Sequence, residues 1–207
     1  MKKPKHLPEN KISLQLPVKI SFETIEDHLR ERFVGENITQ NKNGKLTKYA
    51  EILDLSLEKS SIDDFDIVLA VKFKTLTKFF KNKEGIILLY LSVHFDKEVQ
   101  QVGVKDFKLD GISNNWLFDN SLEAIANTFM HEKLKNKMTF DFQQEMKKQL
   151  PVINAQLVNK MEVKEGIFLS GNLDTFMIND IIVGAAELLI LIDLEGRSTV
   201  EIKKIVL

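Results

Sequence analysis

Long stretches in which apolar and polar residues alternate are the feature that most constrains this fold. Apolar side chains occupy every second position over 65–73 and again over 87–95. A period of two is typical of a strand with one buried face, and 65–78 and 86–95 both exceed the usual strand length of about 5–6 residues. Strands this long favour an elongated, strongly curved sheet, and a helix laid along such a sheet can enclose an apolar groove.

The same alternation predicts strands in both halves of the chain. Pro17 predicts an edge position for the first strand, because proline cannot donate to a neighbour. The adjacent Ile52 and Leu53 break the period and predict a bulge. Asn179-Asp180 and Glu195-Gly196 predict turns. The further predicted strands cover 11–20, 46–57, 99–109, 162–170, 172–178, 182–194 and 197–206.

The spacing of apolar residues predicts a first helix over 22–34. Its stripe has the spacing of one helix face, Ser21 can cap its start, and Gly35 suits its C-terminal end. Asn37–Lys45 is polar and is expected to be a loop. The stripe consists of Phe22, Ile25, Leu29 and Phe33.

A second, interrupted helical region is predicted over 121–158. Its first part has an apolar face from Leu122 to Leu134, and its second part begins near Asp141. Pro151 is expected to kink or split the second part, because proline removes a backbone hydrogen bond. We therefore expect an α+β fold: a flexible arm over 1–10, followed by a single domain over 11–207.

The residues that usually carry chemistry form no recognisable constellation. Cysteine is absent, none of the four histidines has metal-ligand spacing, and the nine glycines form no phosphate loop. Asp63, Asp64 and Asp66 lie together but lack EF-hand spacing. We expect no catalytic residue, no metal and no cofactor, and hence a protein that is not an enzyme.

The charges are balanced, with 29 basic and 30 acidic residues. A nucleic-acid partner is not expected, because such proteins carry a basic surface. Two interpretations of 133–148 stay open: a basic helix that contacts a membrane surface, or a solvated helix face, which Asp141 and Glu145 favour. The basic segment 1–10 is not followed by an apolar signal sequence. The compartment and the oligomeric state are not determined by the sequence.

The 14 phenylalanines, against two tyrosines and one tryptophan, have two explanations. Phenylalanine carries apolar area without a polar group, which suits an interior that holds an acyl chain. An AT-rich genome would raise the phenylalanine content as well, and this simpler explanation is favoured.

Three stretches resemble a bacterial family known as domain of unknown function 4403. They are ISLQLPVKISFETI from Ile12 to Ile25, GIFLSG from Gly166 to Gly171 and ILIDLEG from Ile190 to Gly196. The intervening strands and helices follow the same order, so the resemblance covers most of 11–206. It implies a TULIP-like architecture, in which a highly curved antiparallel sheet wraps around a long helix.

Proteins with that architecture commonly bind lipids in an elongated groove. The resemblance therefore implies a non-enzymatic binding module for a lipid, a fatty acid or another elongated apolar ligand, between helix and sheet. The alternative is a structural or protein-interaction domain with a fully packed core, in which the same side chains are ordinary core residues. The candidate ligand-binding residues are Leu29, Phe33, Phe73, Leu91, Phe129, Met130 and Leu157.

Overall fold

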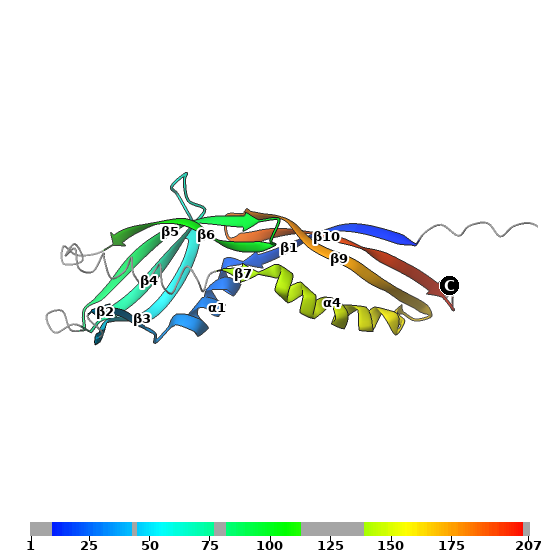
Figure 1. Cartoon of the computed structure of the whole chain (residues 1–207), viewed down its shortest axis with the longest axis horizontal. Coiled ribbons are helices and arrows are strands. Elements are labelled where there is room, and N and C mark those ends of the chain that lie inside the picture. The colour runs from blue at the N-terminus through cyan, green and yellow to red at the C-terminus, as the bar shows by residue number, and fades with distance from the viewer. Residues whose placement is uncertain (1–9, 43–44, 77–81, 113–138, 205–207) are drawn as a thin grey trace, which may run out of the picture.

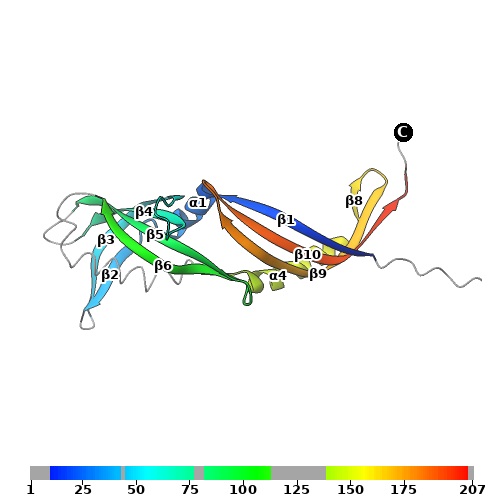
Figure 2. The ribbon, with the colours of Figure 1, turned by 90° about the horizontal axis from the view of Figure 1, so that it is seen from above.

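The computed structural model describes residues 10–42, 45–76, 82–112 and 139–204. The molecule is elongated, with one antiparallel sheet at each end and one helix beside each sheet (Figure 1). Seen from above, the strands of the two sheets follow one another along the long axis (Figure 2). Strand residues far outnumber helical ones in the described ranges, so the prediction of a sheet-dominated α+β fold is confirmed.

The larger sheet has the strand order β2-β3-β4-β5-β6-β7. Its strands are β2 (Asn37–Lys42), β3 (Lys45–Lys59), β4 (Ile67–Thr75), β5 (Glu84–Asp96), β6 (Gln101–Ile112) and β7 (Phe140–Asp141).

The smaller sheet has the order β1-β10-β9-β8. Its strands are β1 (Lys11–Ser21), β8 (Met161–Lys164), β9 (Ile167–Val183) and β10 (Glu187–Ile202). The sequence predicts one sheet, and the structure has two. The reason is the pairing of β1 with β10, which joins the two ends of the chain and which local alternation cannot reveal.

Helix α1 (Phe22–Phe33) follows β1 directly and packs on the larger sheet. The Ser21 hydroxyl accepts a hydrogen bond from the Thr24 N–H at 3.2 Å, which confirms the predicted cap. Gly35 has φ +83°, a left-handed conformation that glycine adopts without strain. The predicted helix is therefore confirmed, and it ends at Phe33, one residue before the predicted end.

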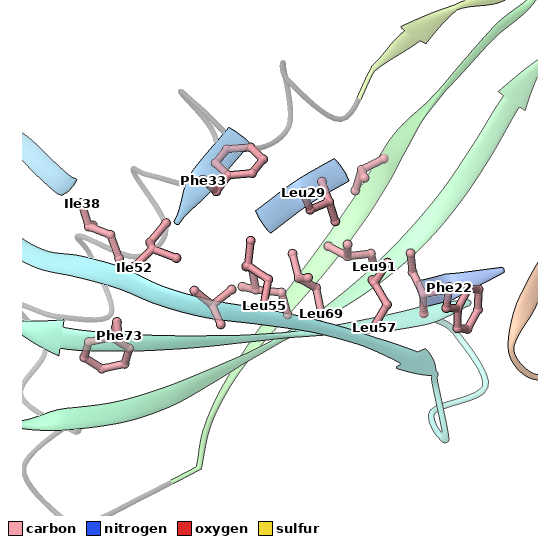
Figure 3. Packing of buried hydrophobic residues seen from close by; sticks show 14 of the residues in the cluster. Phe22, Leu29, Phe33, Ile38, Ile52, Leu55, Leu57, Leu69, Phe73 and Leu91 are labelled. Atoms are coloured by element: carbon pink, nitrogen blue, oxygen red, sulfur yellow. The ribbon is translucent and has the colours of Figure 1, made fainter. Parts of the chain in front are cut away.

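The core of the larger sheet lies between α1 and strands β3, β4 and β5 (Figure 3). Leu29 and Phe33 point from the helix toward the strands. Burial of such side chains contributes roughly 1.5–3 kcal/mol each. The side chains of this core that are at most 1% exposed are Phe33, Ile52, Leu55, Leu69, Phe73 and Leu91.

Two details of the larger sheet test the sequence analysis. The register of β3 against β4 skips Leu53, so the predicted bulge is confirmed. Asn37–Lys45 was expected to be a loop, and this prediction is wrong, because Asn37–Lys42 forms strand β2. This strand lies at the sheet edge, where polar residues are readily tolerated.

The two turns predicted near the C-terminus are wrong, because β9 and β10 run through both positions without a break. The register skips Asn179 between Ile178 and Asp180, and it skips Asp174 in the same strand. At Asn179 the extra residue shifts the alternation by one position, and this shift resembles the end of a strand. Glu195 and Gly196 instead continue β10 opposite the bulge at Asp174. The turns instead lie at Glu165-Gly166 and at 184–186.

Helix α4 (Phe142–Val158) lies beside the smaller sheet (Figure 1). It begins after Asp141, whose carboxylate accepts from the Gln144 N–H at 2.9 Å. The helix continues through Pro151, so a split at that residue is wrong. The predicted helical segment over 121–135 lies outside the described residues.

Candidate functional site

One face of the smaller sheet is apolar over most of its length, with an interruption where Ser198 of β10 pairs with Gly171 of β9. The even-numbered residues of β1 face even-numbered residues of β10, and these pair in turn with apolar residues of β9. At each bulge of β9 one extra residue shifts the alternation by one position, so that the apolar side chains on both sides of the bulge lie on the same face. Toward the larger sheet the face is buried around Ile178, Ile190 and Ile192. Farther from the larger sheet, this face carries side chains that are more than one third exposed: Ile12, Leu14, Leu16, Val200 and Ile202.

A buried glutamine joins the two sheets. Gln100 lies in the turn between β5 and β6, and its side chain donates to the Ile178 carbonyl at 3.0 Å. The Ile178 N–H donates back to Gln100 Oε1 at 2.7 Å. The Gln100 carbonyl also accepts from the Phe142 N–H at 3.0 Å. One residue thus ties the larger sheet to the bulge of β9 and to the start of α4.

An asparagine makes the equivalent connection at the second bulge. Asn154 of α4 donates to the Leu173 carbonyl at 2.9 Å, and the Leu173 N–H donates to Asn154 Oδ1 at 2.7 Å. In both cases a side-chain amide pairs with the N–H and the carbonyl of the residue next to a bulge of β9, so that these backbone groups have hydrogen-bond partners. These two amides fix where the smaller sheet and α4 lie.

A cavity of about 490 Å³ lies where α1, the two sheets and the start of α4 meet. Its wall combines residues that are far apart in the sequence and that the two sheets bring together. Ligand pockets in proteins usually measure about 300–1,000 Å³. The apolar residues of the wall are Ile20, Phe22, Ile25, Leu29, Leu57, Ile67, Val93, Val102, Val104, Phe140, Phe142, Ile181, Leu188 and Ile190.

The polar part of the wall comes mainly from α1. Thr24, His28 and Arg32 line the cavity and are exposed to solvent. They are spaced four residues apart, so they lie on one side of the helix. The buried Phe22, Leu29 and Leu57 lie deeper in the same cavity. The site therefore has an apolar floor and a polar rim on α1.

The other arginine of α1 is fully engaged in ion pairs. Arg30 contacts the carboxylates of Asp54 at 2.9 Å, Glu26 at 3.1 Å and Asp27 at 3.1 Å. The hydrogen bond from Arg30 is the main cause that lowers the pKa of Asp54, followed by the bond from the Leu55 N–H. The pairing of Glu26 with Arg30, four residues apart, is thus part of a surface network.

The predicted ligand-binding residues that the structure describes lie in three different places. Leu29 lines the cavity. Phe33, Phe73 and Leu91 are not among the residues that line it and lie in the packed core of the larger sheet. Leu157 is half-buried on α4, away from the lining. Phe129 and Met130 lie outside the described residues.

Sequence analysis missed most of the wall that the smaller sheet contributes. Ile20 and Ile190 were recognised as strand residues, but only the pairing of β1 with β10 places them beside α1. The start of α4 was predicted correctly, yet nothing local indicated that Phe142 would face the cavity. A pattern of correlated substitutions between 12–20 and 188–196 would be the signal for this pairing.

The aspartates considered for a cation have structural roles where their contacts are defined. Asp66 accepts a hydrogen bond from the Val93 N–H at 2.7 Å and so fixes β5 opposite the bulge at Lys105 of β6. Within the described ranges, no group of three or more His, Asp or Glu side chains is arranged to hold a metal ion. No helix among those residues combines the length and apolarity required to cross a membrane.

The sequence matches the family model named domain of unknown function (DUF4403) over residues 1–202. The chain belongs to this family. The resemblance seen in the short stretches of β1, β9 and β10 is therefore confirmed over nearly the whole chain. No curated protein and no solved structure matches this DUF4403 chain.

Proposed function

We propose that this DUF4403 chain is a non-enzymatic binding module for an elongated apolar ligand, such as a fatty acid or another lipid. The observation that carries the proposal is the cavity of about 490 Å³ between α1 and the two sheets. The proposal includes the TULIP-like view of the fold, in which helix and curved sheet together enclose the ligand.

The composition of the wall supports this proposal. Transfer of apolar ligand surface from water to such a wall contributes about 25 cal/mol per Å². Phe22, Phe140 and Phe142 supply ring surface that makes no demand for hydrogen bonds. A few polar groups at one side of an apolar pocket are typical of sites that orient a ligand.

Titration with a fluorescent acyl probe tests the proposal. The wild type should bind the probe saturably. Ile25→Trp should abolish this binding, because Ile25 is half-buried on α1 and lines the cavity, so that an indole there fills it. Ile12→Trp is the matched control, since Ile12 lies on β1 and is 40% exposed.

The control should bind the probe as the wild type does. The ligand-binding proposal would be wrong if wild-type protein, in a preparation in which the cavity has been confirmed, does not bind the probe saturably. Equal binding by both tryptophan variants would show that the probe binds elsewhere.

A structural or protein-interaction domain is the second candidate. The exposed apolar side chains on the distal part of the smaller sheet favour it, because contiguous exposed apolar surface often marks a contact with another protein. Ile25→Trp distinguishes the two candidate functions. It should abolish binding of an apolar ligand in the cavity, but it should leave a protein contact at Leu14 and Val200 unchanged.

A further inference from the structure

We infer that the cavity selects an amphiphile with one anionic head group, whose carboxylate or phosphate oxygens are bound by Arg32 with His28 at the rim. This inference rests on the proposed function and adds the chemical class of the ligand. An apolar cavity alone would accept an alcohol, an ester or an acid of equal chain length. The charges around the rim on α1 distinguish among these.

The two arginines of α1 differ sharply in their partners. Arg30 is surrounded by three carboxylates, which neutralise it. Arg32 lines the cavity, and no hydrogen bond or ion pair connects it to any of the residues described. A guanidinium presents paired N–H donors that match the geometry of a carboxylate or a phosphate. Arg32 is thus an unused anion-binding group beside an apolar cavity.

The neighbouring groups add to the preference for an anion. His28 lies one helical turn before Arg32, lines the same cavity, and also makes no hydrogen bond or ion pair with the described residues. Thr24, one turn further back, adds a hydroxyl to the rim.

The acidic residues of α1 do not oppose this arrangement at the cavity. No aspartate or glutamate is among the described residues that line it. Glu26 and Asp27 contact Arg30, on a different part of the helix surface. Glu23 and Glu31, the other acidic residues of α1, do not line it either. The described lining therefore offers donors and one fixed positive charge and includes no carboxylate.

The arrangement also defines how the ligand lies. The head group contacts the exposed part of α1, and the chain extends past Leu29 toward Leu188 and Ile190 at the joint of the sheets. A ligand bound this way keeps its charge in contact with water and buries only its chain, which avoids the cost of a desolvated charge.

The test compares three ligands of equal chain length: a fatty acid, an alkyl phosphate and the corresponding alcohol, each displacing the fluorescent acyl probe. Wild-type protein should bind the two anions at least about tenfold more tightly than the alcohol, in line with the energy of a charge-assisted hydrogen bond. The ratio of acid to phosphate identifies which head group fits better.

Arg32→Gln should lower the affinity for both anions about tenfold and leave the affinity for the alcohol unchanged. Arg32→Glu should lower anion binding further. Arg197→Gln is the matched control, because Arg197 is an exposed arginine on β10 that does not line this cavity, and it should retain the preference for anions.

The outcomes separate this inference from the function on which it rests. Equal binding of anions and alcohol by the wild type, or an anion preference that survives Arg32→Gln, would overturn the role of Arg32 and leave the binding module intact. Failure of all three ligands to displace a bound probe, or to bind, would overturn the proposed function and this inference with it.

Discussion

Helices α1 and α4 lie on their sheets in different ways. Helix α1 buries Phe22, Leu29 and Phe33 against the larger sheet, whereas α4 has no buried residue at all. The larger sheet has an extensive buried hydrophobic cluster, whereas the buried cluster of the smaller sheet consists, among the described residues, of Ile178, Ile190 and Ile192. One end of the molecule is thus a conventional close-packed core, and the other is a sheet with a helix attached at specific points.

This difference explains where a cavity can persist. Close packing around Leu55, Leu69 and Phe73 leaves no room for a guest. At the joint, a polar clamp from Gln100 to Ile178 holds the two sheets together, and a second clamp, from Asn154 to Leu173, holds α4 against β9. The apolar surfaces at the joint therefore need not be fully packed together. The space beside Phe142 and Leu188 is a consequence of that arrangement.

The largest expected effect comes from a matched pair of leucine truncations. Leu69→Ala should cost about 2–5 kcal/mol, because Leu69 is fully buried in β4. Leu14→Ala should change stability by less than about 0.5 kcal/mol, because Leu14 in β1 is 52% exposed. Urea unfolding of both variants measures the difference, and equal losses would refute the contrast between the two sheets.

Loss of the glutamine clamp should have the next largest effect. Gln100→Ala leaves a buried N–H and carbonyl of Ile178 without their partners, at a cost of about 2–3 kcal/mol. The same variant should weaken binding of the acyl probe, because the clamp sets the distance between the sheets. A variant that loses stability yet binds the probe as the wild type does would show that the clamp does not define the cavity.

Loss of the asparagine clamp should act mainly on α4. Asn154→Ala should cost about 1–2 kcal/mol and should raise the hydrogen-exchange rates of α4 amides more than those of α1. Uniform acceleration across both helices would mean that α4 is as strongly coupled to the core as α1.

The smallest expected effect concerns the ion pairs of α1. Since Arg30 holds the pKa of Asp54 below its ordinary value of 3.8, the ionised carboxylate stabilises the fold above that pH. This contribution is lost as the pH falls through the lowered pKa. Asp54→Asn should cost less than about 1 kcal/mol at pH 7, because the pair is largely exposed. The variant should also show a weaker loss of stability below pH 3.8 than the wild type, in melting curves recorded across that range.

The local parts of the fold were accessible from the sequence, for identifiable reasons. Ser21 and Gly35 mark the ends of α1 because capping is a property of adjacent residues. The bulge at Leu53 was visible because two apolar residues stand together where the pattern requires one. The bulge at Asn179 was mistaken for a turn, since a polar residue that shifts the phase looks the same in both cases.

The candidate site was less accessible, because it depends on contacts between distant segments. Leu29 was identified from the stripe of α1, but its neighbours Ile190 and Phe142 come from the far end of the chain. Phe33, from the same helical stripe, and Phe73, from an alternating strand, belong to the same buried cluster as Leu29 but do not line the cavity. A periodic pattern of apolar residues predicts that a side chain is buried. It does not predict whether that side chain packs against other protein atoms or faces a cavity.

Native mass spectrometry with lipid extraction tests the central claim most directly. Wild-type protein, Ile25→Trp and Ile12→Trp would be purified identically from cells. The account predicts an additional mass on the wild type and on Ile12→Trp, released as an anionic amphiphile, and its absence from Ile25→Trp, whose indole would occupy the cavity. The same additional mass on all three proteins, or on none, would contradict the claim that the cavity at the joint of the two sheets is a ligand site.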